Sequence, residues 1–432
     1  SRRAGVVFCK RADVGSIFDS DPRAGRVVMV LSRRAMLVGA ASSLATSAYA
    51  QAPLTSLRPI ARVSVDDAIA RMVAGSGLNG NVGVVVVDLA TGEEIESINA
   101  SIAQPPASVT KAFTALYALD VLGEEYQFKT RIFADGVINN GILDGNLILA
   151  GGGDPELATD DLFDLAQSLK GSGLREVKGD FLVWDEALRN VDEIDSDQLD
   201  HFGYNPTVTG LNLNYNRVHF EWKRTDDDFI TAMDARSANY RPAVTTSRIN
   251  IVDQPDPVFT YRKDGDVDQW TVARPSLNDE GSRWLPVRHP GLYAGEVFAT
   301  FARSHGIVLK SPQETLVEPT GQVLATKEGA PLAQVMQGML RYSTNLTAEV
   351  AGLAATNQRV GEKRGMRTSA IGMARWMTTR CGGITPHFVD HSGLGDLSRV
   401  SPADMAKMLA APEVMITLQP IMRDIRPVSY TH

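Results

Sequence analysis

The chain has 432 residues, with 43 Lys and Arg against 51 Asp and Glu and a formal net charge of −8. Hydrophobic residues make up 44% and charged residues 22%, which excludes wholesale disorder and leaves room for two or three packed domains. The acidic balance argues against nucleic-acid binding, two cysteines cannot form a disulfide framework, and no apolar run is long enough for a stable membrane span.

Residues 1–50 differ from the rest of the chain because they carry eight basic and only three acidic residues. Within them, residues 29–50 contain the pair Arg33-Arg34, a weakly apolar run and the small-residue pattern Ala48-Tyr49-Ala50. These features indicate a secretory signal, and the paired arginines resemble a twin-arginine signal. We therefore expect export to the periplasm, and we interpret residues 1–28 as untranslated or mis-assigned sequence. The alternative is a short surface helix with two arginines.

The first part of the remaining chain, residues 51–126, predicts helices and a hairpin. Apolar spacing predicts a helix that begins at Ser64, and β-branched runs predict two strands over 82–89 and 93–98. A long helical pattern then runs from Ser108 to about Leu122.

The sequence pattern changes over residues 127–290, which contain short β-like segments, glycine-rich turns and acidic runs. We interpret this segment as an inserted, strand-rich domain. Helical periodicity returns over 291–432, where Ser401 and the proline after it are typical of a helix start. Further helices are expected at 291–305, 332–340, 347–355 and 369–379.

A serine and a lysine three residues apart lie where the long helix begins, in Ser108-Val109-Thr110-Lys111. The positive end of a helix favours an alkoxide-like charge on Ser108 by about 0.3–1 kcal/mol. The spacing places Lys111 on the same helix face, where a neutral amine can act as general base. Neutrality requires burial or a nearby cation, because an ordinary lysine has a pKa of ~10.4. The alternative is a capped helix with an exposed lysine.

A second candidate element, Tyr342-Ser343-Thr344-Asn345, lies between two predicted helices. A loop held by packed helices is a favourable mounting for a site. The Ser343 hydroxyl can relay a proton from Lys111 to a leaving nitrogen, and the Asn345 amide can hold a substrate carbonyl and shield the lysine. Taken alone, such a segment is usually an ordinary turn or cap.

Two other patterns are misleading. His387 and His391 have the spacing of zinc ligands on a helix, but glycines and a proline surround them and the glutamate of the zinc motif is absent. The glycine pattern at 75–80 follows a predicted helix, whereas a dinucleotide site requires a preceding strand. We interpret the histidines as ordinary loop or strand residues and the glycines as a helix stop.

Together the serine–lysine and serine–asparagine motifs resemble the active-site set of penicillin-binding proteins and class A β-lactamases. More of the chain, from about 62 to 420, resembles the D-alanyl-D-alanine carboxypeptidase/endopeptidase family, peptidase family S13. The resemblance rests on five boxes in family order: Pro105–Lys111; Ala150–Pro155; Leu211–Asn216; Ser343–Asn345 followed by Ala348-Glu349; and Asp390–Leu394 followed by Arg399–Pro402.

The resemblance implies a mixed α/β (α+β) fold. Residues 51–126 and 291–432 would form a transpeptidase-like domain, an antiparallel sheet packed by helices, and the β-rich domain at 127–290 would interrupt it. It also implies a serine-type D-Ala-D-Ala carboxypeptidase or endopeptidase that acts on peptidoglycan stem peptides through an acyl-enzyme. β-Lactams would be covalent inhibitors, and no metal or organic cofactor is implied.

The resemblance also assigns roles to five residues. Ser108 would be the nucleophile and Lys111 the general base, while Ser343 and Asn345 would assist proton transfer and position the substrate. Asp154, from the glycine-rich box, would lie near the amino-bearing side chain of the substrate.

The chain departs from the family in one respect: no Lys-Thr-Gly, Lys-Ser-Gly or His-Thr-Gly follows Asn345. In the family this third motif binds the substrate carboxylate, helps to keep the base neutral and precedes an oxyanion-hole donor. Loss of one such donor typically costs ~10²–10³ in rate. We therefore expect a polypeptide truncated before this motif and impaired in turnover. The alternatives are a non-catalytic penicillin- or muropeptide-binding fragment and, third, a β-lactamase or esterase.

Overall fold

The computed structural model describes residues 4–10, 65–77 and 80–422. The expected signal at 29–50 lies outside the described residues and stays a prediction. The chain divides into two compact units. Unit 1 comprises Ser1–Ala107, Ala374–Phe388 and Asp396–His432, and unit 2 comprises Ser108–Met373 and Val389–Gly395.

Unit 1 contains a three-stranded antiparallel sheet in the order β1-β2-β3. Its strands are β1 (Ala4–Lys10), β2 (Val82–Asp88) and β3 (Glu94–Ile98). The predicted hairpin is thus confirmed as β2 and β3. Strand β1 was not expected, because it lies in the segment interpreted above as sequence outside the natural product. Its run Val6-Val7-Phe8 has the β-branched and aromatic character that favours strands.

The helices of unit 1 include α2 (Val65–Gly75), α9 (Pro402–Ala410) and α10 (Pro412–Leu418). The predicted start of α9 is confirmed: the Ser401 hydroxyl accepts a hydrogen bond from the Asp404 N–H at 3.0 Å, and Pro402 occupies the first helical position.

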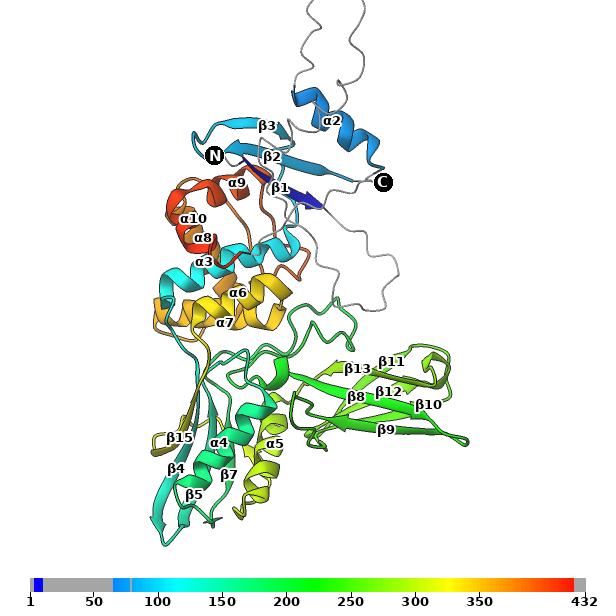
Figure 1. The fold of residues 1–432 in the computed structure, drawn as a ribbon, viewed down its shortest axis with the longest axis vertical. Helices are drawn as coiled ribbons and strands as arrows, with labels where there is room; N and C mark the ends of the chain where they lie inside the picture. The colour runs from blue at the N-terminus through cyan, green and yellow to red at the C-terminus, as the bar shows by residue number, and fades with distance from the viewer. Residues whose placement is uncertain (1–3, 11–64, 78–79, 423–432) are drawn as a thin grey trace, which may run out of the picture. The chain divides into compact units, whose positions relative to one another are not determined.

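Unit 2 is built around a mixed sheet in the order β14-β7-β5-β4-β15, and β6 also pairs with β5 (Figure 1). Alternate residues of the sheet belong to different cores. Leu147 and Leu149 pack with helices α4 and α5, whereas Ile148 and Ala150 belong to a second cluster with Trp184. These elements are β4 (Lys129–Asn139), β5 (Ile142–Gly151), α4 (Thr159–Gly171), β6 (Glu176–Val177), β7 (Phe181–Trp184), α5 (Pro290–Ser304), β14 (Pro312–Glu314) and β15 (Gln322–Glu328).

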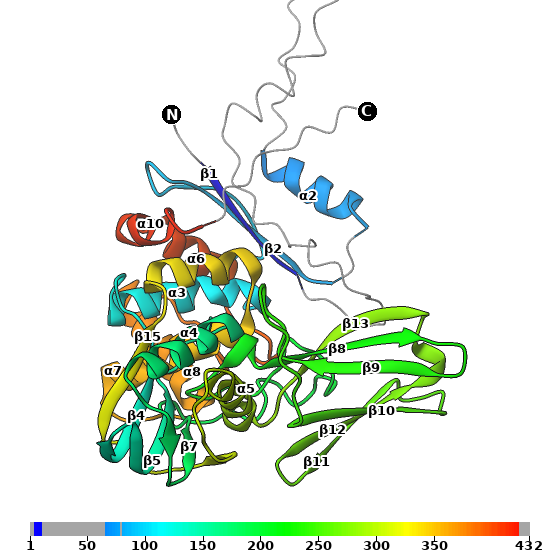
Figure 2. The same cartoon turned by 60° about the horizontal axis from the view of Figure 1, so that its bottom comes forward.

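Two three-stranded sheets of unit 2 share the core with α4 and α5 (Figure 2). Buried Phe220 and Trp270 come from their central strands, β8 and β12. Ten strands, β4 to β13, lie within 127–290, so the predicted strand-rich texture is confirmed. The domain boundary at residue 290 stays a prediction. Strands β14 and β15 follow residue 290 in the chain and complete the larger sheet. The two sheets comprise β8 (Arg217–Arg224), β9 (Phe229–Asp234) and β13 (Glu280–Pro286), and β10 (Ser247–Val252), β11 (Phe259–Asp264) and β12 (Val267–Ala273).

The helical part of unit 2 confirms the predicted helices, with ends that differ by a few residues. All residues from Thr110 to Leu119 of α3 are buried, so this helix is enclosed around its whole circumference, with Lys111 among the buried side chains. Ser108 lies in a 3-10 turn, Ala107–Val109, directly ahead of α3. The helices are α3 (Thr110–Leu122), α6 (Leu332–Tyr342), α7 (Asn345–Val360) and α8 (Met366–Arg380), of which α8 belongs to unit 2 as far as Met373.

Helix α7 contains a glycine where it faces the segment 389–395. A Cβ added at Gly352 would lie 2.1 Å from Cδ2 of His391, whose side chain is fully buried. Glycine within a helix is destabilising by about 1 kcal/mol relative to alanine. The imidazole therefore occupies space that only glycine leaves open.

We expect Gly352→Ala to destabilise the protein by roughly 1–3 kcal/mol, because overpacking against His391 outweighs the helix propensity that alanine gains. Urea unfolding followed by tryptophan fluorescence measures the change. Gly171→Ala is the matched control, because nothing lies within 4 Å of its added Cβ at the end of α4. Equal stability of the two variants would contradict this packing argument.

Candidate active site

Ser108 and Lys111 meet at the start of α3. The Lys111 Nζ donates a hydrogen bond to the Ser108 Oγ at 3.3 Å, so the predicted serine–lysine contact is present in the structure. Ala107, the residue before the serine, has a φ of 47°, which is rare for a residue with a side chain. Such backbone strain is concentrated at functional sites, where the surrounding structure holds it.

The Lys111 ammonium group makes two further hydrogen bonds, to Asn345 Oδ1 at 2.7 Å and to the Ser392 carbonyl at 2.8 Å. The residue is only 1% exposed. Burial lowers the pKa of Lys111 to about 8, and the charges of Glu349 and Asp390 oppose this decrease. About one tenth of the amine is therefore neutral at pH 7, and a general base must be in this neutral form.

Ser343 and Asn345 lie on either side of the junction between α6 and α7. Asn345 is the first residue of α7, and its Nδ2 donates to the Tyr204 carbonyl at 2.9 Å, which orients the amide oxygen toward Lys111. Ser343 caps α6 in a left-handed conformation with a φ of 59°. Its side chain is exposed, and within 65–77 and 80–422 its hydroxyl makes no hydrogen bond.

Asp154 lies three residues after the end of β5 in unit 2. Its Oδ1 accepts a hydrogen bond from the Glu156 N–H at 3.0 Å, and its carboxyl lies against Gly329. Burial raises the pKa of Asp154 to about 6, although the Glu156 N–H opposes this increase. In the described part of the chain it makes no hydrogen bond to Ser108, Lys111 or Asn345.

A buried glutamate–histidine pair near the lysine was not assigned a role from the sequence. The Glu349 carboxylate accepts a hydrogen bond from His391 Nδ1 at 2.8 Å, and both side chains are fully buried. Glu349 also accepts from the backbone N–H groups of His391 and Ser392, at 3.0 and 2.8 Å. The available signal was a glutamate in the middle of an apolar helix, since such a residue is rarely buried unless it is paired.

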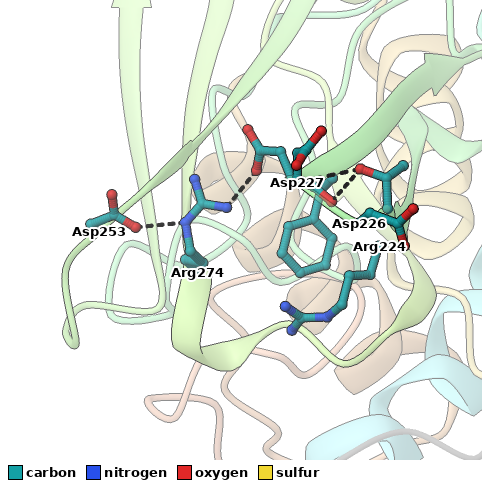
Figure 3. A pocket seen from close by; sticks show the side chains of 8 residues that line it. Arg224, Asp226, Asp227, Asp253 and Arg274 are labelled. Atoms are coloured by element: carbon teal, nitrogen blue, oxygen red, sulfur yellow. Dashed lines mark hydrogen bonds and ion pairs between the residues drawn. The ribbon is translucent and has the colours of Figure 1, made fainter.

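Unit 2 also has a polar pocket lined by Arg224–Phe229, Asp253 and Arg274 (Figure 3). Arg274 forms ion pairs with Asp228 and Asp253, and the four carboxylates of the lining outnumber its two guanidinium groups. None of the eight lining residues is a serine, cysteine, histidine or lysine. The pocket therefore lacks a serine beside a lysine, and the chemistry is assigned to Ser108 and Lys111.

Residues 65–77 and 80–422 contain no group of three or more His, Cys, Asp or Glu side chains arranged to hold a metal ion. Across the helices of these ranges, none combines the length and the apolar character needed to cross a bilayer.

Comparisons with solved structures show the fold. The crystal structure of penicillin binding protein 4 from Haemophilus influenzae superimposes with a TM-score of 0.66 at 22% identity, over 78% of this chain and 77% of that one. A complex of the same protein with a β-lactam gives a TM-score of 0.63 at 21% identity, over 79% and 75% of the two chains. The expected mixed α/β fold class is thereby confirmed.

Sequence comparisons identify curated relatives. A D-alanyl-D-alanine carboxypeptidase from an Actinomadura species is 27% identical over 352 residues, which is 76% of this chain and 62% of the relative. D-alanyl-D-alanine carboxypeptidase DacB from H. influenzae is 35% identical over 128 residues, or 30% of this chain and 26% of the relative. The chain thus spans less than two thirds of the length of both relatives.

The model of one protein family, D-Ala-D-Ala carboxypeptidase 3 (S13), matches residues 65–426. This range includes all five boxes and the contacts of Lys111 described above. The resemblance stated from the motifs is confirmed, and the chain belongs to the S13 family of D-Ala-D-Ala carboxypeptidases.

Proposed function

We propose that this chain is a serine-type D-Ala-D-Ala peptidase that cleaves peptidoglycan stem peptides through an acyl-enzyme. The observation that carries the proposal is the buried Lys111 amine, hydrogen-bonded to Ser108 Oγ and Asn345 Oδ1 and with its pKa lowered to about 8. Family membership and the names of the two curated relatives support the choice of substrate.

In the proposed reaction, neutral Lys111 takes the hydroxyl proton of Ser108 while Oγ attacks the carbonyl carbon of the D-Ala-D-Ala bond. The tetrahedral intermediate then collapses, the C–N bond breaks, and the leaving nitrogen receives a proton. Water hydrolyses the ester on Ser108 and restores the enzyme. Asn345 holds the lysine and the substrate amide, and Ser343 passes the proton onward. The exposure of the Ser343 hydroxyl, two residues before Asn345, supports this role.

Asp154 supplies a negative charge for an amino group of the substrate in this proposal. Because its pKa is raised only to about 6, the carboxyl is ionised at neutral pH. Its burial restricts the carboxyl to one orientation and makes the attraction stronger than at a solvated surface.

The first prediction concerns pH. Only the neutral amine of Lys111 can accept the serine proton, so the rate of Ser108 acylation by a chromogenic cephalosporin rises with pH and levels off above about 8. At pH 7 about one tenth of the lysine is neutral, and at pH 6 about one hundredth. Stopped-flow absorbance from pH 6 to 9.5 measures this profile. A rate that does not change between pH 6 and 8 would contradict the role of Lys111.

Lys111→Gln is the matched variant, because it retains a long polar side chain but has no titratable amine. We expect it to lower acylation by at least ~10² and to remove the rise toward pH 8, consistent with the loss of a general base. Circular dichroism checks that the variant is folded.

The second prediction concerns turnover. These 432 residues contain no Lys-Thr-Gly after Asn345. We therefore propose that this polypeptide forms a long-lived adduct with fluorescent penicillin and hydrolyses a D-Ala-D-Ala peptide at ~10²–10³ below the rate of a chain that has the second oxyanion-hole donor. The two hydrolysis rates are compared by measuring the release of D-alanine from the peptide. Rapid release would contradict the impairment, and rapid loss of the penicillin adduct would favour a β-lactamase. Absence of any adduct would favour the non-catalytic muropeptide-binding alternative.

The proposed place of action is the periplasm. Support comes from the pair Arg33-Arg34 and the pattern Ala48-Tyr49-Ala50, together with the extracytoplasmic location of peptidoglycan. In a bacterial host we expect the mature protein in the periplasmic fraction with an N-terminus at Gln51. Retention of an uncleaved chain in the cytoplasm would contradict the proposed export.

A further inference from the structure

The buried pair of Glu349 and His391 belongs to a longer hydrogen-bond network. His391 Nε2 lies 2.9 Å from the Ser369 Oγ, and Ser369 donates to the Thr356 Oγ1 at 2.6 Å. Thr356 in turn lies 3.1 Å from the hydroxyl of Tyr117. The network therefore runs from Glu349 on α7 through the imidazole to residues on α8, α7 and α3.

The hydrogen bonds of this network assign roles to the two ring nitrogens of His391. With Ser369 donating to Thr356 Oγ1 or to the Gly352 carbonyl, Nε2 of His391 is the donor to Ser369. A carboxylate only accepts, so His391 Nδ1 must donate to Glu349. With these roles both ring nitrogens are donors, as they are in an imidazolium.

The network is connected to Lys111 through one residue. The Ser392 N–H donates to Glu349 at 2.8 Å, and the carbonyl of Ser392 accepts from the Lys111 Nζ at 2.8 Å. The loop is held in addition by Thr114 on α3, whose hydroxyl donates to the His391 carbonyl at 2.6 Å. The imidazole of His391 fits only because the residue of α7 that faces it is Gly352.

Few other ionisable groups face these residues. From the loop, Asp390 acts on Lys111, but its carboxyl is held by the N–H groups of Gly393 and Gly395. From α3 and α7, Tyr117 and Arg359 contact each other at the far end of the network. From α8, Ser369 faces His391 and Met373 faces Thr114, and neither carries a charge.

We propose that the buried imidazolium–carboxylate pair of His391 and Glu349 is the positioning device of Lys111. In this pair the imidazolium neutralises the Glu349 carboxylate, which is connected to the Lys111 ammonium group through Ser392. The pair also holds the Ser392 carbonyl to which the ammonium group donates. Both side chains are fully buried, so they act through the lysine and not directly on a substrate. This inference rests on the proposed function, in which Lys111 must lose its proton to act.

The experiment measures the pH profile of Ser108 acylation by the chromogenic cephalosporin in three variants. His391→Asn retains an N–H donor toward Glu349 but removes the positive charge, so Glu349 acts on Lys111 without compensation. We expect the midpoint of the profile to rise by about 1–3 pH units, because an unpaired opposite charge at close range favours the protonated lysine. The rate at pH 7 would then fall at least ~10-fold, while the high-pH plateau stays close to that of the wild type.

The double variant Glu349→Gln with His391→Asn removes both charges and is expected to return the midpoint to the wild-type value. A merely structural role would instead make the double variant worse than the single one. Thr114→Val is the matched control, since it deletes a hydrogen bond to the same loop without changing any charge. We expect it to lower the unfolding free energy but to leave the midpoint unchanged. An unshifted midpoint in His391→Asn, or no recovery in the double variant, would overturn the proposal.

A second measurement separates this inference from the proposed function. ¹⁵N NMR of the histidine ring in the wild-type chain should show both nitrogens of His391 protonated at neutral pH. One unprotonated nitrogen would overturn the inference even if acylation proceeds. If the wild type is not acylated at all, the proposed function fails, whereas the NMR result still decides whether the imidazolium exists.

Discussion

The site depends on the burial of one ammonium group. Lys111 is almost fully enclosed, and an isolated buried charge is costly unless it is paired and hydrogen-bonded. The protein supplies three oxygen acceptors, from Ser108, Asn345 and the carbonyl of Ser392. Only one of them is local in sequence, because the other two are 234 and 281 residues away. The fold of unit 2 thus has to bring α3, α7 and the segment 389–395 together before the lysine can form these hydrogen bonds.

The same burial makes the lysine reactive. Desolvation lowers its pKa, while the neighbouring carboxylates of Glu349 and Asp390 raise it, so the balance of these effects decides how much neutral amine exists near pH 7. An unpaired Glu349 would favour the protonated form, and in the proposal above the paired histidine offsets that bias. Gly352 makes room for the imidazole, but a glycine inside α7 lowers the stability of the helix relative to alanine. Packing and catalysis are therefore coupled through the contact between α7 and the loop.

The parts of this account that the sequence could predict are those with local signals. The approach of Lys111 to Ser108 could be predicted from their spacing at the start of a helix, and the place of Asn345 could be predicted from its position at the junction of two helical patterns. The Ser392 carbonyl could not be predicted, because a backbone acceptor has no side-chain signature. The pairing of Glu349 with His391 was missed since it joins segments 42 residues apart. The parallel pairing of β14 with β7 likewise depends on long-range contacts that leave no trace in local propensity.

The most direct test of the central claim identifies the acylated atom. The chain is treated with penicillin, denatured and digested, and its peptides are mapped by mass spectrometry beside those of Ser108→Ala. The account predicts one penicilloyl group, on the peptide that contains Ser108, and none anywhere in the variant. A penicilloyl group on another residue, or an equal adduct in Ser108→Ala, would contradict it.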